Sequence, residues 1–147
     1  MRLKKWSSDK LKGLKGCFLC GSNKDDVLEI YRDKNHLVVL DKYPPTKGYT
    51  LVALKKHKSD ISELTEKEYV ELNKLVYRTS KAIRKAFKPK RIVLLQSGIF
   101  NNHFHFHIIP MYEDIYMNLL NVITKKTIID FSKKEWGDIR NKIKRFL

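Results

Sequence analysis

The chain has 147 residues, 42% of them hydrophobic, which suits one domain with a core of its own. No apolar run approaches the roughly 20 residues that a membrane span needs, and the basic start lacks the apolar segment of a secretory signal, so we expect a cytoplasmic protein. Lysine and arginine outnumber aspartate and glutamate by 31 to 16, and the resulting formal charge of +15 attracts polyanions such as nucleic acid, although a lysine-rich solvated surface is the simpler explanation.

The first 20 residues combine a basic segment with a pair of cysteines. Residues 1–16 are basic and interrupted by glycines, and we expect a surface arm with a short helical turn after Ser8. Cys17 and Cys20 follow in a compact Cys-Phe-Leu-Cys turn. In a reducing compartment this spacing indicates metal or redox chemistry more than a structural disulfide. A redox pair and two unrelated buried thiols are the alternatives to a metal site.

Apolar and β-branched runs predict four strands before the histidine-rich segment. Residues 27–31 and 36–41 form a hairpin, and residues 49–54 form a third strand that ends just before His57. Residues 91–96 form a fourth strand, and their unbroken apolar run predicts burial on both faces.

Two capping boxes predict two helices. Thr65 and Glu68 have the spacing of such a box, and the apolar periodicity behind them predicts one long amphipathic helix to about Phe87. Ser132 and Glu135 repeat the pattern before a C-terminal helix. The order of elements predicts an α+β domain, in which an antiparallel sheet of about five strands carries both helices.

Residues 103–110, His-Phe-His-Phe-His-Ile-Ile-Pro, hold three of the five histidines at alternate positions. In an extended strand these histidines line one face and the apolar residues line the other. We expect Pro110 to end the pairing, because it has no N–H to donate. A row of imidazoles costs desolvation unless it binds something, and imidazole suits metal ligation, nucleophilic attack and acid-base chemistry.

The two thiols need two further ligands to close a tetrahedral zinc site. Since the chain has no other cysteine, the candidates are His36, His57 and the histidines of residues 103–107. Spacing alone does not choose between His36 and His57, although His57 follows a strand end and is better placed to turn toward the cysteines.

His-Phe-His-Phe-His-Ile-Ile resembles the His-x-His-x-His-x-x signature, with apolar x, of the histidine triad superfamily of nucleotide hydrolases and transferases. Residues 47–52, Lys-Gly-Tyr-Thr-Leu-Val, are similar to the family's Lys-Gly-His-Thr-Leu-Val segment, with tyrosine in place of histidine. The zinc-bearing branch takes its ligands from an N-terminal Cys-x₂-Cys, a Lys-x-His after the third strand and the first triad histidine. The matching positions are Cys17, Cys20, His57 and His103. Four protein ligands leave no open position, so the resemblance implies a structural zinc.

The resemblance covers residues 17–110 and implies a single domain over residues 1–147, in which residues 111–147 form a C-terminal extension. It further implies a homodimer, for which the long helix is a plausible interface element.

The resemblance also implies a reaction. A nucleoside 5′-monophosphate group is transferred or hydrolysed from a dinucleoside polyphosphate or a nucleoside phosphoramidate. His105 would attack the α-phosphorus to give a nucleotidyl-histidine, and His107 would hydrogen-bond the phosphoryl oxygens or the leaving group. Asp41 is implied as the acceptor for the ribose hydroxyls of a purine nucleotide, and Gln96 as a phosphate contact. An ordinary turn aspartate and an ordinary loop amide remain the alternatives at these two positions.

One segment departs from the family pattern. Many members have a longer loop before the first triad histidine, ending in Gly-Gln-Ser/Thr-x-x-His, whose hydroxyl and amide bind phosphate. This chain has Ile-Phe-Asn-Asn at residues 99–102, so Asn101 or Asn102 would supply replacement N–H donors. The short loop is similar to that of the aprataxin-like branch, which removes AMP from nucleic-acid ends, and such a deadenylase is one alternative function. A zinc-stabilised nucleotide- or RNA-binding module without turnover is another.

Overall fold

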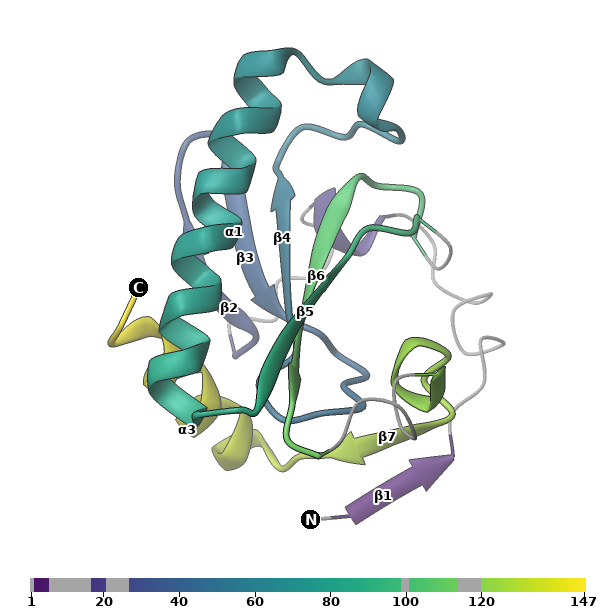
Figure 1. Ribbon diagram of the computed structural model, residues 1–147, viewed down its shortest axis with the longest axis vertical. Helices are drawn as coiled ribbons and strands as arrows, with labels where there is room; N and C mark the ends of the chain where they lie inside the picture. The colour runs from purple at the N-terminus through teal and green to yellow at the C-terminus, as the bar shows by residue number, and fades with distance from the viewer. Residues whose placement is uncertain (1, 6–16, 21–26, 99–100, 114–119) are drawn as a thin grey trace.

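The fold is built on a five-stranded antiparallel sheet, shown by a computed structural model that describes residues 2–5, 17–20, 27–98, 101–113 and 120–147 (Figure 1). The strand order is β2-β3-β4-β6-β5, with bounds β2 Glu29–Arg32, β3 His36–Leu40, β4 Thr50–Leu54, β5 Arg91–Leu95 and β6 His105–Met111. A second sheet pairs β1 (Arg2–Lys5) with β7 (Thr127–Asp130). The helices are α1 (Glu66–Phe87) and α3 (Lys133–Lys144), with 3-10 turns η2 (Phe18–Cys20) and η3 (Ile61–Glu63). The predicted α+β class is confirmed.

Alternation of side chains along the strands gives the sheet two different faces. One face packs against α1 and α3, and its strand residues include Ile30, Val38, Val52 and Ile108. The opposite face is covered by Leu19 from η2 and by Val122, which pack with residues such as Leu37, Leu51 and Ile109. Because Phe106 and Ile108 of β6 face the helices, His105 and His107, which alternate with them, lie on the second face, together with Ile109 and Met111.

Helix α1 begins and ends where the sequence predicts. The Thr65 hydroxyl accepts from the backbone N–H of Glu68 at 3.1 Å, and the Glu68 carboxylate accepts from the backbone N–H of Thr65 at 2.8 Å. This reciprocal capping box satisfies two N–H groups that have no partner within the helix. At the other end Lys88 adopts the left-handed conformation, with φ of 51°, and Pro89 follows. The same capping box forms at Ser132 and Glu135 before α3, which confirms the second helix.

Two expectations about the strands are wrong. Strand β5 is not buried on both faces: it lies at the edge of the sheet, and 52% of Leu94 is exposed. Pro110 does not end the pairing, because β6 continues to Met111 and pairs Pro110 with Ile92. Strand β4 pairs with β6 only as far as Ile108, so Pro110 has a neighbouring strand on one side alone. A residue without an N–H is tolerated there.

The N-terminal residues pair with a strand from the C-terminal part of the chain. Arg2–Lys5, expected in a surface arm, form strand β1 against β7, and the backbone N–H of Ile129 donates to the carbonyl of Pro44 at 2.8 Å. The helical turn expected after Ser8 falls outside the described residues. Within the described ranges, no helix combines the length and the apolar character needed to cross a bilayer.

Candidate functional site

The three histidines of residues 103–107 lie side by side on the sheet face opposite α1. Strand β6 places His105 opposite Ala53 of β4 and His107 opposite Leu51, and all three imidazoles are buried. The rings of His105 and His107 have centroids 4.5 Å apart. The strand alternation predicted from the sequence is therefore observed.

One hydrogen bond sets the tautomer of His105. Its Nδ1 lies within hydrogen-bond distance of the backbone carbonyl of His103. A carbonyl oxygen can only accept, so the ring proton lies on Nδ1 and the lone pair of the neutral imidazole lies on Nε2. Burial lowers the pKa of His105, which favours this neutral form. The ring is thus neutral and held in one orientation, with the lone pair of Nε2 unprotonated.

A tyrosine holds His107. The Tyr49 hydroxyl lies 3.0 Å from Nδ1 of His107, and both side chains are buried. With the hydroxyl as donor, Nδ1 accepts and the ring proton lies on Nε2. Burial, with a further contribution from His105, lowers the pKa of His107 to about 3, while burial and the nearby carboxylate of Asp41 raise the pKa of Tyr49. Both groups therefore remain neutral near pH 7.

Asp41 forms a buried ion pair at the end of β3. Its Oδ2 accepts from Nζ of Lys125 at 2.6 Å, and its Oδ1 accepts from the backbone N–H of Tyr43 at 2.7 Å. Burial alone would raise the pKa of Asp41, but the ammonium of Lys125 outweighs it and the pKa is lowered. The same Nζ lies 5.3 Å from the centre of the Tyr49 ring. Tyr49 thus lies between the ammonium of Lys125 and the imidazole of His107.

The two predicted phosphate contacts lie at the surface. Gln96 follows the end of β5 and Asn102 immediately precedes His103, and both are exposed. Among the described residues, neither hydrogen-bonds to the triad. The neighbouring Asn101 instead lies near the thiol of Cys17, with a distance of 3.6 Å from Sγ to Oδ1.

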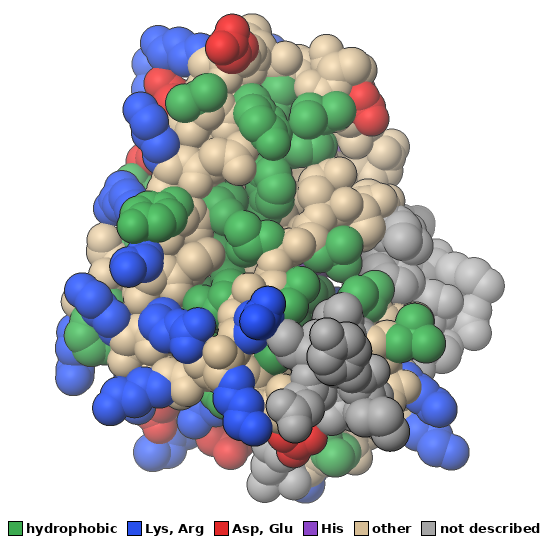
Figure 2. Space-filling view, viewed as in Figure 1, with side chains coloured by type: hydrophobic (Ala, Val, Ile, Leu, Met, Phe, Trp, Pro, Cys, Tyr) green, Lys and Arg blue, Asp and Glu red, His purple; other side chains and the backbone are tan. Residues whose placement is uncertain are grey.

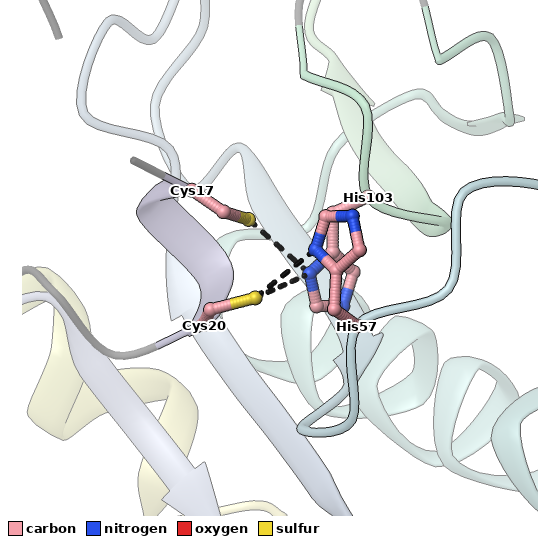
Figure 3. A group of neighbouring side chains, drawn as sticks. All are labelled: Cys17, Cys20, His57 and His103. Atoms are coloured by element: carbon pink, nitrogen blue, oxygen red, sulfur yellow. Dashed lines mark hydrogen bonds between the residues drawn. The ribbon is translucent and has the colours of Figure 1, made fainter. Parts of the chain in front are cut away.

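Four predicted metal ligands converge near one end of the triad (Figure 3). The candidate ligand atoms of Cys17, Cys20, His57 and His103 all lie within 4.8 Å of one another. Nδ1 of His103 lies 3.2 Å from the sulfur of Cys17 and 3.3 Å from that of Cys20, and Nδ1 of His57 lies 3.1 Å from the sulfur of Cys20. This group of two thiols and two imidazoles can bind a metal ion.

The surroundings of the cluster also suit a cation. Nε2 of His103 lies 2.8 Å from the carbonyl of Leu54 and must donate to it, so the lone pair on Nδ1 faces the thiols. Such an outer hydrogen bond to a carbonyl is usual for a metal-binding histidine. Desolvation and the adjacent Cys17 thiol raise the pKa of Cys20 to about 11. Both cysteines can therefore be deprotonated together at neutral pH only when a cation lies between them.

The structure decides between the two histidine candidates that spacing left open. His57 joins the cysteines, whereas His36 is buried in the β2–β3 hairpin with its Nδ1 3.0 Å from the Asp33 carboxylate. Sequence reasoning missed two members of the site. Tyr49 lies two residues before Leu51, which pairs with His107, so the alternation of the strand could have placed it on the histidine face. No sequence signal distinguishes Lys125 from the adjacent Lys126.

Sequence comparisons agree with this geometry. Residues 22–114 match the HIT domain family. An uncharacterized HIT-like protein of Methanocaldococcus jannaschii is 38% identical over 88 residues, which cover 57% of this chain and 68% of that protein. The adenosine 5′-monophosphoramidase of Schizosaccharomyces pombe is 32% identical over 101 residues, which cover 64% of this chain and 73% of the enzyme.

Solved structures show the same fold. A hypothetical histidine triad nucleotide-binding protein of Sulfolobus tokodaii superposes with a TM-score of 0.68 at 28% identity, covering 88% of this chain and 90% of that one. A zinc-bound histidine triad family protein of Mycobacterium smegmatis gives 0.61 at 20% identity, with coverages of 94% and 91%, and this likeness concerns the fold alone. Because the family match spans most of the chain and includes the whole histidine strand, the protein belongs to the HIT family of nucleotide hydrolases and transferases.

Proposed function

We propose that the protein cleaves a nucleoside 5′-monophosphate from a phosphoanhydride or a phosphoramidate through a nucleotidyl-histidine intermediate on His105. The observation that carries this proposal is the fixed tautomer of His105. Its Nδ1–H is committed to the carbonyl of His103, so the Nε2 lone pair is available for attack. The buried, neutral state of the ring keeps that lone pair unprotonated.

The chemistry proceeds in two displacements. Nε2 of His105 attacks the α-phosphorus, an N–P bond forms, and the leaving group departs with its bonding electrons. His107 donates its Nε2–H to the phosphoryl oxygens or the leaving group, where negative charge develops. Water then attacks phosphorus, the N–P bond breaks, the electron pair returns to Nε2, and the proton lost by the water passes to solvent.

Dinucleoside polyphosphates and nucleoside phosphoramidates are the proposed substrates. The name of one relative, an adenosine 5′-monophosphoramidase, supports the second class. We assign the ribose hydroxyls of a purine nucleotide to Asp41, at the end of β3, and the phosphate region to Gln96 and Asn102. A carboxylate suits the first task because it can accept from two hydroxyls.

A trapped intermediate tests the assignment. The protein mixed with an adenosine phosphoramidate and quenched in alkali should show an adenylyl adduct on the peptide that holds His105 by mass spectrometry. His105→Asn should remove both the adduct and turnover while AMP still binds. His36→Asn is the matched control, because this histidine is held in the β2–β3 hairpin by Asp33. Unchanged hydrolysis by His105→Asn would refute the nucleophile.

We also propose that the cluster of Cys17, Cys20, His57 and His103 holds a structural zinc ion. All four positions would be filled by protein, so the ion would cross-link η2, the segment after β4 and the start of the histidine strand. Metal analysis should find one zinc per chain, and cobalt substitution should give the absorption of a tetrahedral site with two sulfur ligands. A metal content unchanged in Cys20→Ser would contradict the ligand set. Reduced thiols as ligands support a cytoplasmic location.

A deadenylase acting on nucleic-acid ends is the second candidate. The net charge of +15 and the short segment at residues 99–102 favour it. Incubation with adenylated DNA and, separately, with diadenosine polyphosphate distinguishes the two substrates. If neither is cleaved although nucleotides bind, the protein is a zinc-stabilised nucleotide-binding or RNA-binding module.

A homodimer through α1 and β5 completes the proposal. Figure 2 shows hydrophobic side chains gathered on the face that these two elements form. Val70 and Tyr77 of α1 and Leu94 of β5 are 43%, 65% and 52% exposed, and β5 is an open edge of the main sheet. A second copy would cover both features. Light scattering should give twice the monomer mass, with Tyr77→Lys shifting the protein to monomer and Lys67→Ala leaving it unchanged.

A further inference from the structure

Part of the C-terminal extension contributes a side chain to the histidine face. Residues 120–123 are helical and lie beyond residues 22–114, the segment that matches the HIT domain. Val122 is buried in the apolar layer on the histidine side of the sheet. The helix ends in a tight turn, in which the backbone N–H of Lys125 donates to the carbonyl of Val122 at 3.2 Å and that of Lys126 donates to Asn121 at 3.0 Å.

The turn gives two adjacent lysines opposite environments. Lys125 has a φ of 50°, a left-handed position usually taken by glycine at the end of a helix. Its side chain is only 6% exposed, whereas Lys126 is exposed. A non-glycine residue in this conformation is disfavoured unless its surroundings hold it there, and such residues gather at ligand-binding sites.

Lys125 forms an ion pair with Asp41. Nζ lies 2.6 Å from Oδ2, and Asp41 is itself only 4% exposed. Oδ1 of the same carboxylate already accepts from the backbone N–H of Tyr43. A ribose cannot reach this carboxylate while the lysine covers it.

We propose that Lys125 competes with the nucleoside for Asp41, so that residues 120–126 must withdraw the ammonium before a nucleotide binds. This inference rests on the proposed function, which assigns the ribose to Asp41. The free protein is then mostly closed, and its apparent affinity for nucleotide is reduced in proportion to the open fraction. Lys125 sets how tightly nucleosides are held, although it lies outside the family motif.

AMP itself is the probe for this competition. Calorimetry should show that Lys125→Met, which keeps the length of the side chain but removes its charge, binds AMP roughly tenfold more tightly than the wild type. Lys126→Met should bind like the wild type. Equal or weaker binding by Lys125→Met would overturn the competition, and weaker binding would make Lys125 a substrate contact instead.

Hydrogen exchange supplies a second measurement that needs no variant. AMP added to the wild-type protein should speed amide exchange in residues 120–126, and unchanged or slower exchange with AMP bound would overturn the proposal. Detection of the adduct on His105 distinguishes failure of the competition at Asp41 from failure of the proposed function. An adduct with no gain in AMP affinity for Lys125→Met removes this inference alone. Absence of both the adduct and AMP binding removes the proposed function, and this inference with it.

Discussion

Replacement of Tyr49 by phenylalanine isolates one hydroxyl group beside the reacting centre. The ring of Tyr49 stays in the apolar layer, while Nδ1 of His107 loses the donor that lies 3.0 Å away. Two effects follow. The proton of His107 is no longer confined to Nε2, and a buried acceptor is left without its partner.

The magnitude follows from the burial of both groups. A buried acceptor that loses its donor costs about 1 to 3 kcal/mol. If that whole cost falls on the transition state, kcat/KM decreases by about 5- to 140-fold, at about 1.4 kcal/mol for each factor of ten. A loss in kcat with little change in KM would place the effect in the transition state, where His107 meets the developing charge.

Hydrolysis of adenosine 5′-phosphoramidate, followed as AMP release, measures the rate. Nitrogen-15 NMR of the imidazoles reports the tautomer of His107 directly and does not depend on turnover. Tyr49→His, which supplies a ring N–H as a hydrogen-bond donor in place of the hydroxyl, should recover part of the rate. Tyr77→Phe on the exposed face of α1 is the control. Tyr49→Phe with wild-type kcat/KM and an unchanged His107 tautomer would refute the positioning role.

Three further predictions concern the metal, a buried histidine and a helix cap. Chelation of the metal, or Cys20→Ser, should lower the melting temperature, and readdition of zinc should restore it only in the wild type; an unaffected melting temperature would argue against a structural metal. The pKa of His107 is depressed to about 3, so between that value and about 6.5 the unfolded chain binds more protons and stability falls as the pH falls. His107→Asn should remove up to about 1.4 kcal/mol per pH unit from that slope in urea titrations, and an identical slope would contradict the neutral buried ring. Thr65→Ala should reduce the free energy of unfolding by about 1 kcal/mol through loss of the cap on α1, with Lys67→Ala at an exposed position of the same helix as the comparison.

Features encoded by neighbouring residues could be predicted from the sequence. The capping box at Thr65 and Glu68 fixes the start of α1 within one turn, and alternation along residues 103–108 decides which side chains share a face. The apolar patterns of the single helices and strands, taken in chain order, also predict the α+β class. These are local effects, and each can be read within a window of about ten residues.

Features that depend on the order of strands could not be predicted. The apolar run of β5 predicted burial on both faces, but the edge position leaves Leu94 exposed, and sheet order is a property of the whole chain. The choice of His57 over His36 required either the family resemblance or the coordinates. His36 contacts Asp33, which lies three residues earlier at the hairpin turn. This local contact could have been predicted from the sequence. Lys125 is brought to Asp41 across 84 residues by packing that no local pattern records.

The metal cluster and the reacting imidazole are joined through a single residue. The side chain of His103 directs Nδ1 toward both thiols and donates from Nε2 to the carbonyl of Leu54, while its backbone carbonyl accepts the Nδ1–H of His105. A metal ion that fixes the imidazole of His103 therefore also restrains the carbonyl that keeps the lone pair of His105 on Nε2. A bound ion would need no open coordination position to influence the proposed reaction, because its effect would be transmitted through the orientation of the His103 peptide group. A metal site with four protein ligands would in this way take part in positioning the proposed nucleophile.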